Sequence, residues 1–198
     1  MIGTAYHNRI MTFGFILMSL VFCCKSAEAV ISKDDVKALE TVKKILDTKA
    51  YDIEISTIYP QNTVASAQAI NSLLLRQTGN SASRIDVSGD NYSIKLKDSV
   101  VKGDLPFFGE SRFSSGGYNG SSSGINLDGK TQDYSLSFNV KKNNYVVEFT
   151  TRDSKHKIES YKVQLTIFLN RNVDVYITSS HRTMIRYLGV LSEIELEE

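Results

Sequence analysis

The chain has 198 residues, which is enough for one domain with a hydrophobic core of its own. Apolar residues make up 41% of it and charged residues 23%, a balance that excludes a disordered or membrane-spanning protein. The formal net charge is only +1, so the overall charge gives no reason to expect nucleic acid as a partner.

The N-terminal segment has the features of a secretory signal peptide. Arg9 precedes the apolar stretch Ile10–Cys24, and Ala27 and Ala29 stand at the small-residue positions of a signal-peptidase site. The apolar stretch is shorter than the ~20 residues that a membrane-spanning helix needs. We therefore predict that residues 1–29 are removed and that the protein is exported to the periplasm or cell envelope, with no transmembrane span in the mature chain.

Both cysteines, Cys23 and Cys24, lie at the end of this apolar stretch. Cleavage after Ala29 would leave a mature chain without cysteine, and so without disulfides, thiol catalysis or cysteine-ligated zinc. The alternative is that Cys23 or Cys24 is lipidated, which would anchor the protein to the outer membrane. Phe22 and Cys23, the residues that precede these cysteines, are bulkier than such sites usually have. Secretion is therefore the first expectation.

The stretch "SKDDVKALETVKKILDTK" predicts a helix over about residues 33–48. Ser32 can cap it, Asp34 and Asp35 lie in the positive first turn, and lysines lie toward the negative end. Its apolar stripe is Val36, Leu39, Val42 and Leu46. We expect this stripe to pack on a protein core and not on a membrane surface.

From Tyr51 onward the apolar residues alternate, as they do in strands. "YDIEISTIYP" predicts one strand, and "RIDVSGDNYSIKLK" predicts a short hairpin about Gly89-Asp90. The stretch "VASAQAINSLLLRQTGN" between them is ambiguous between a short helix and an irregular segment. Further on, "YSLSFNV" and "YVVEFTT" form a hairpin about Asn143-Asn144, and three more strands follow up to about residue 190.

The order of elements is one helix followed by about eight or nine strands with short connections, without strand-helix alternation. A long antiparallel meander must protect its edges, so we predict a single mainly-β domain over residues 30–198 that closes into a barrel. A two-sheet β-sandwich is the alternative fold.

Several motifs occur together in an order that resembles a known family. They are "LPFFGE", "GINLDG", the paired strands "YSLSFNV" and "YVVEFTT", "VQLTIFLNRNVDVYITSSHR" and "IRYLG". The chain is similar over about Tyr51–Leu191 to the domain-of-unknown-function family DUF4251 of Bacteroidetes-type bacteria. The resemblance implies an exported antiparallel β domain with lipocalin-like barrel topology. It implies no activity and no catalytic residues.

The residues of the mature chain provide no catalytic signature, metal site or cofactor site. His156 lies in a charged loop, and His181 lies at a strand end after two serines, without a nucleophile-elbow motif. The acids Asp86 and Asp90 lack the spacing of a calcium loop. Arg182, Arg186 and Tyr187 are the nearest approach to a nucleic-acid surface, and a local cluster on a solvated face explains them.

The glycine- and serine-rich stretch 107–129 is the best candidate for a contact surface, because it is long and carries aromatic residues between two strands. It has neither of the glycine patterns of phosphate-binding loops. Its candidate binding residues are Phe107, Phe108, Arg112, Phe113 and Tyr118. We predict a non-enzymatic binding or interaction module, with a small apolar ligand or an envelope protein as partner.

The alternative function is a small periplasmic hydrolase acting near this loop. Acids that flank the loop could form the carboxylate pair that glycoside hydrolysis requires. They are Asp104, Glu110, Asp128 and Asp133. The simpler interpretation is that these acids belong to turns, as in Asp128-Gly129.

Overall fold

A computed structural model describes residues 33–61, 67–68, 71, 80–109, 124–152 and 159–194. The first described element is the helix α2, Lys33–Thr48, with Asp34 and Asp35 in its first turn, as predicted. No described helix is long and apolar enough to cross a membrane.

The apolar stripe of α2 packs on the core through its C-terminal half. Val42, Ile45 and Leu46 are buried, whereas Val36, the first residue of the predicted stripe, is 44% exposed. The last turn carries no basic residue. Instead, the hydroxyl of Thr48 donates to the carbonyl of Ile45 at 2.7 Å and accepts from the amide of Ala50 at 3.1 Å. These bonds satisfy backbone groups that the helix end leaves unpaired.

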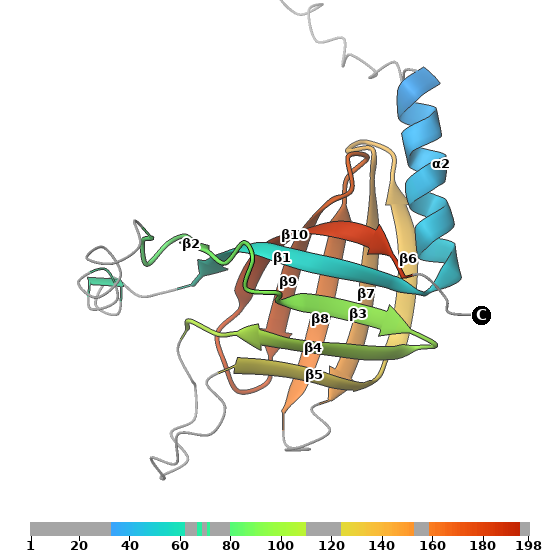
Figure 1. The fold of residues 1–198 in the computed structure, drawn as a ribbon. Coiled ribbons are helices and arrows are strands. Elements are labelled where there is room, and N and C mark those ends of the chain that lie inside the picture. The colour runs from blue at the N-terminus through green and yellow to red at the C-terminus, as the bar shows by residue number, and fades with distance from the viewer. Residues whose placement is uncertain are drawn as a thin grey trace, which may run out of the picture. The chain divides into compact units, whose positions relative to one another are not determined.

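The remaining regular elements are strands that form one antiparallel sheet (Figure 1). They are β1 Tyr51–Pro60, β2 Ile85–Asp86, β3 Ser93–Lys97, β4 Val100–Pro106, β5 Gly124–Lys130, β6 Gln132–Asn139, β7 Asn144–Arg152, β8 Ser160–Ile167, β9 Asn172–Ser179 and β10 Ile185–Glu193. Their order in the sheet is β5-β4-β3-β1-β10-β9-β8-β7-β6, and β2 pairs with β1.

The sheet is nearly closed into a barrel, which confirms the predicted fold class. Strands β1 and β10, far apart in the sequence, pair along their length from Tyr51–Glu193 to Pro60–Ile185. The two ends of the sheet, β5 and β6, are consecutive in the chain, and β5 lies against β7. At this seam the hydroxyl of Thr151 donates to the carbonyl of Lys130 at 3.3 Å.

The inward side chains of the strands form one apolar core, to which α2 contributes. Alternate residues of β7, β8, β9 and β10 point inward, because successive side chains of a strand lie on opposite faces of the sheet. Residues with no exposed surface include Ile53, Val147, Val163, Leu165, Val175, Ile177 and Tyr187.

The predicted hairpin about Gly89-Asp90 was wrong, although both of its strands exist. Strands β2 and β3 pair with β1 and not with each other. β3 pairs with β1 from Tyr51 to Glu54, and β2 pairs with it at Thr57 and Ile58, beyond an irregularity in the β1–β10 register. Both strands therefore pair with β1, which precedes them in the sequence, and do not form a local hairpin. Of the ambiguous stretch, only residues 67–68 and 71 are described, and they are helical.

Candidate functional site

One end of the barrel carries the two predicted contact residues that the structure describes. Phe107 and Phe108 follow β4, are partly buried, and pack against the core. The guanidinium carbon of Arg182, in the turn between β9 and β10, lies 5.2 Å from the centre of the Phe107 ring, a cation–π arrangement. The other predicted contact residues, Arg112, Phe113 and Tyr118, lie outside the described residues, as do Cys23 and Cys24.

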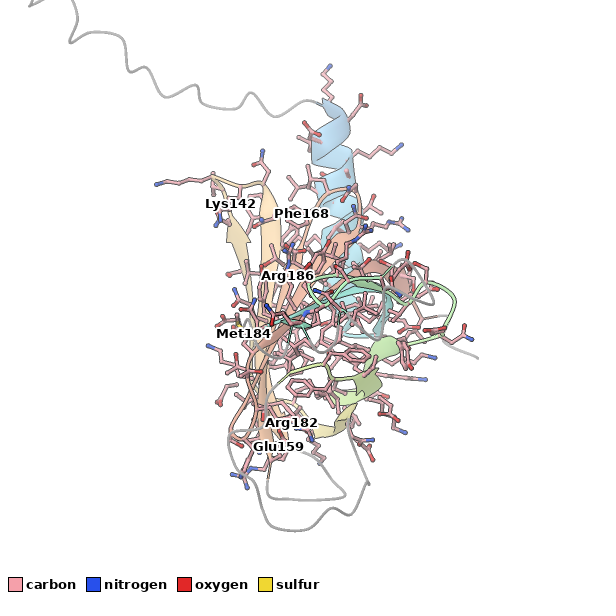
Figure 2. All side chains as sticks on the ribbon, turned by 90° about the vertical axis from the view of Figure 1, so that its left-hand side faces the viewer. Lys142, Glu159, Phe168, Arg182, Met184 and Arg186 are labelled. Atoms are coloured by element: carbon pink, nitrogen blue, oxygen red, sulfur yellow. The ribbon has the colours of Figure 1, made fainter. Side chains whose placement is uncertain are left out.

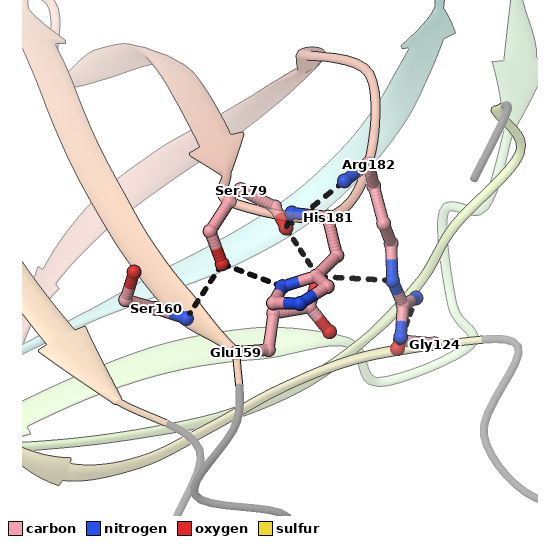
Figure 3. A network of polar contacts seen from close by, with 7 residues as sticks. Gly124, Glu159, Ser160, Ser179, His181 and Arg182 are labelled. Carbon is pink, nitrogen blue, oxygen red and sulfur yellow. Dashed lines mark hydrogen bonds and ion pairs between the residues drawn. The ribbon is translucent and has the colours of Figure 1, made fainter. Parts of the chain in front are cut away.

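A buried carboxylate organises this end of the barrel (Figure 3). Glu159, just before β8, is only 9% exposed and accepts a hydrogen bond from the hydroxyl of Ser179. Arg182 Nε lies 3.1 Å from Glu159 Oε1, and Arg182 Nη1 donates to the carbonyl of Gly124 at 2.7 Å. The network thereby joins the start of β5, the start of β8 and the turn after β9.

Ser179 is saturated with hydrogen bonds inside this network. Its oxygen accepts from the amides of His181 at 2.9 Å and Arg182 at 3.2 Å, while its own hydrogen goes to Glu159. Because the Ser179 side chain satisfies two backbone donors, it holds the turn after β9 in place. We refer to Glu159, Ser179 and Arg182 as the rim network.

The neighbouring Ser180 forms a second polar contact. Ser180 Oγ and His181 Nδ1 are 2.7 Å apart, and Ser180 Oγ also accepts from the amide of Ser160 at 3.2 Å. The His181 imidazole therefore contacts a serine hydroxyl, although the sequence has no nucleophile-elbow motif around it. His156 lies outside the described residues.

Three of the four acids that flank the predicted loop are described, and all three lie on strands. Asp104 is opposite Asn126, and Asp128 is opposite Lys102, in the β4–β5 register. Asp133 lies on β6, where the pairing of β6 with β7 is irregular, and has a φ of 53°. Glu110 is outside the described residues. Among the described residues, no group of three or more His, Cys, Asp or Glu side chains could hold a metal ion.

A second candidate site lies on the outer face of β7 to β10. Two hollows of about 650 and 720 Å³ open there, and Lys142, Phe168 and Asp174 line both of them. Asn143 and Arg186 line the first hollow, and Asn144, Tyr176 and Met184 line the second. We call the two hollows together the outer groove. Lys142, Phe168, Arg186 and Met184 can be followed along this face in Figure 2.

Strand pairing brings three side chains of this face together. Tyr59, Arg186 and Tyr176 are cross-strand neighbours on β1, β10 and β9. The Arg186 guanidinium lies 5.0 Å from the ring centre of Tyr59 and 5.7 Å from that of Tyr176. Its Nη2 donates to both oxygens of Asp174, at 2.9 and 3.0 Å, and these bonds are the main cause of a raised pKa of Arg186. Arg186 and Asp174 are thus fixed as a neutral pair.

Several polar atoms along the groove have no protein partner. The side-chain oxygens of Asn143 and Asn144, and Nε of Arg186, are buried and make no hydrogen bond with the described part of the chain. Asn144 is only 1% exposed. A buried polar atom without a partner is costly. These three atoms have almost no exposed surface, so a ligand in the open hollows does not reach them.

The outer groove was not predicted from the sequence. The prediction that Arg182, Arg186 and Tyr187 form a solvated cluster was wrong. Tyr187 is fully buried, because it lies on the opposite face of β10 from Arg186, and Arg182 belongs to the rim network. Alternation along β10 could have separated Tyr187 from Arg186. Tyr59 and Asp174 could be placed beside Arg186 only from the strand pairing.

Comparison with known proteins places the chain in a family. Residues 33–191 match the family described as Domain of unknown function (DUF4251), so the chain belongs to it, as the sequence motifs indicated. A solved structure, described as that of a DUF4251 family protein from Bacteroides eggerthii DSM 20697, superposes with a TM-score of 0.52 at 14% identity. The match covers 79% of this chain and 88% of the other, and at this identity it supports the fold alone. No curated protein matches the chain.

Proposed function

We propose that the protein is a non-enzymatic binding module of the cell envelope that meets its ligand on the outer face of the barrel. The observation that carries this proposal is the outer groove itself, two hollows that share Lys142 and the partly exposed ring of Phe168. The inward side chains, by contrast, pack against one another in one apolar core. A ligand on the outer face would need no rearrangement of that core.

The rim network has a supporting role in this proposal. Its charged atoms bond to one another and to the Gly124 carbonyl, so they are already occupied by the protein. We infer that it holds the ends of the 107–129 stretch in place. Phe107 and Phe108 are then positioned for contact with a partner, together with Arg112, Phe113 and Tyr118 as the sequence predicts.

The test is to purify the protein from the envelope of its source organism and identify what comes with it by native mass spectrometry. We expect a bound small molecule that is lost from the Phe168→Ala variant. Phe138→Ala is the matched control, because both phenylalanines are 36% exposed and only Phe168 lines the groove. Equal occupancy in both variants, or none in the wild type, would contradict binding in the groove.

Export is part of the proposal and has its own test. The signal-like segment 1–29 supports cleavage after Ala29, which would give a mature chain that begins at Val30. N-terminal sequencing and intact-mass measurement of the envelope protein check this directly. An acylated Cys23 or Cys24 would establish a lipoprotein, whereas an uncleaved cytoplasmic chain would contradict export.

A hydrolase remains the second candidate because Ser180 Oγ and His181 Nδ1 are 2.7 Å apart beside the 107–129 stretch. A Ser-His pair needs such a contact for nucleophilic attack. The test is hydrolysis of p-nitrophenyl acetate by the wild type and by Ser180→Ala. Turnover that disappears in Ser180→Ala would favour the hydrolase, and equal background rates would remove it.

A further inference from the structure

We infer that one end of the barrel docks on the surface of an anionic lipid bilayer. This end consists of the β6–β7 turn, residues 140–143, and the β8–β9 turn, residues 168–171, which together we call the basic tip. The two turns lie side by side at the top of Figure 1, because Tyr145 at the start of β7 pairs with Ile167 at the end of β8. The inference goes beyond the proposed function, since it concerns the attachment of the protein and not the ligand of the outer groove.

The first property of the basic tip is its positive charge. Lys141, Lys142 and Arg171 are exposed in the two turns. No acid occurs in residues 139–147 or in residues 163–173. A lysine or arginine near the surface of an anionic bilayer is attracted to it, and the attraction falls off within the Debye length. The three cations therefore favour an anionic surface as the partner of this end.

Neighbouring elements do not cancel this charge. Asp174 is already paired with Arg186, and Glu54, opposite Val190 on β1, adds one exposed acid. Helix α2 runs to the same end of the barrel in Figure 1. It carries four lysines and four acids, namely Lys33, Lys37, Lys43 and Lys44 against Asp34, Asp35, Glu40 and Asp47. The helix is thus neutral, and this end of the barrel keeps a net positive charge.

The second property is the exposure of apolar side chains among these cations. Val140, directly before Lys141, is 72% exposed. Phe168 in the other turn is 36% exposed, and Val190, which pairs with Asn172 beside that turn, is 47% exposed. Binding at a bilayer surface depends on buried apolar area as well as on charge. An acidic polymer would engage the cations and leave Val140 in water, whereas an anionic bilayer accommodates both.

The third property is that the two turns satisfy their own backbone donors. The side-chain oxygen of Asn139 accepts from the amides of Lys141, at 3.1 Å, and Lys142, at 3.2 Å. In the other turn the amide of Arg171 donates to the carbonyl of Phe168 at 2.9 Å. A backbone donor without a partner is costly where lipid replaces water. The turns can therefore enter the headgroup region without leaving these amides unpaired.

Arg171 is also held in a conformation that arginine seldom adopts. Its φ is 66°, in the left-handed region that glycine and asparagine occupy more readily. Its carbonyl accepts from the amide of Leu191 at 2.8 Å, which fixes the turn against β10. A costly residue at a fixed position indicates a role for its side chain. The role that the basic tip supports is contact between the guanidinium group and an anionic headgroup.

The experiment is sedimentation of the processed protein from the envelope with two kinds of vesicle, at low and at high sodium chloride. One kind contains phosphatidylcholine and phosphatidylglycerol, and the other contains phosphatidylcholine alone. We expect binding to the anionic vesicles that weakens at high salt, because salt screens exposed charges. Lys141→Ala/Arg171→Asn should weaken it about twenty-five-fold at low salt, or about five-fold for each cation removed. Asparagine replaces Arg171 because it adopts the same φ.

A second variant tests the apolar contribution, and a third is the matched control. Val140→Ser should weaken binding about five-fold at either salt concentration, because apolar burial is lost. Lys97→Ala/Lys102→Ala removes two exposed lysines from β3 and β4 and should weaken binding less than about two-fold, since charges outside the contact are screened. Val140, Lys141 and Arg171 line neither hollow, so their variants leave the outer groove intact.

The outcomes separate this inference from the proposed function. Equal binding to both kinds of vesicle would overturn the inference, because a lipid anchor alone would produce it. Equal weakening by Lys141→Ala/Arg171→Asn and by the lysine control would overturn it as well. Binding to poly-aspartate or duplex DNA, with none to anionic vesicles, would overturn it in favour of an acidic macromolecule. A protein without a groove ligand that still binds anionic vesicles through the basic tip would contradict the proposed function and support this inference.

Discussion

Arg182 and Glu159 form an almost completely buried ion pair, with Nε and Oε1 3.1 Å apart and side chains only 14% and 11% exposed. Loss of one partner leaves the other charge in a poorly solvated place. We therefore expect Arg182→Leu to lower the free energy of unfolding by about 3–5 kcal/mol, as measured by urea denaturation.

The control for this prediction is an exposed ion pair of the same sheet. Lys162 and Glu148 are 3.7 Å apart with side chains 58% and 38% exposed, so Lys162→Leu should cost no more than about 1 kcal/mol. The double variant Arg182→Leu/Glu159→Leu should recover part of the stability lost in Arg182→Leu, because it leaves no unpaired charge. Similar small costs for Arg182→Leu and Lys162→Leu would show that the rim network is not a stabilising element.

Tyr187 should make the protein sensitive to alkaline pH. Burial is the main cause of its pKa lying far above the usual value of a tyrosine, and its hydroxyl donates to the carbonyl of Pro106 at 3.0 Å. Above about pH 10 the unfolded chain releases the phenolic proton while the folded chain keeps it. The folded state then binds more protons than the unfolded state, so stability falls by about 1.4 kcal/mol per pH unit for each such tyrosine.

The variant Tyr187→Phe tests this reasoning in two pH ranges. Below about pH 9 it should be less stable than the wild type by about 1 kcal/mol, because the hydrogen bond to Pro106 is lost. Above about pH 10 its stability should fall less steeply, since one of the buried phenols is gone. Urea unfolding at a series of pH values measures both effects. Parallel pH profiles for the two proteins would mean that Tyr187 ionises without unfolding.

The fold could be predicted from the sequence to the extent that it depends on local alternation. The hairpin of β6 and β7 forms as predicted, but its turn is residues 140–143, because Asn144 already pairs with Asn139. Asn143 has a φ of 48°, a conformation that asparagine adopts more readily than most residues. The predicted hairpin about Gly89-Asp90 failed because β2 and β3 each pair with β1, a strand that is distant from both in the sequence. Local turn signals carry no information about such pairing.

The outer groove could not be predicted for the same reason. Tyr59, Asp174 and Arg186 meet only because β1 pairs with β10 and β10 with β9. Alternation along one strand places Arg186 on the outer face, but it does not identify the residues beside it. The buried carboxylate Glu159 was also missed, since it follows a charged loop in the sequence and resembles a solvent-exposed residue there.

Gly189 permits the close pairing of β1 and β10. A Cβ at this position would lie 2.4 Å from the carbonyl oxygen of Glu54 and 2.9 Å from Cγ2 of Ile53. Gly189→Ala must therefore move the backbone of β1, and we expect a loss of about 1–3 kcal/mol in urea unfolding. Val190→Ala, at a residue that is 47% exposed, should change stability by less than about 0.5 kcal/mol. A Gly189→Ala protein as stable as Val190→Ala would show that the two strands can separate freely here.

The seam between β5 and β7 should be the place where the barrel opens first. Thr151 closes it with one hydrogen bond to Lys130, and Gly129 lies so close that a Cβ there would be 2.9 Å from the carbonyl oxygen of Arg152. Thr151→Val keeps the side-chain shape and removes the bond, so we expect a loss of about 1 kcal/mol. Gly129→Ala should push the seam apart as well.

Hydrogen exchange distinguishes opening of the seam from a general loss of stability. In Thr151→Val and Gly129→Ala, amide exchange should accelerate in β5 and β6, while the amides of β8 and β9 should exchange only as fast as the change in global stability requires. β8 and β9 each have a paired strand on both sides, whereas β5 and β6 form the ends of the sheet. If all four strands accelerated equally, the seam would open only with the whole fold. Exchange confined to β5 and β6 would instead identify the weakest junction of the barrel.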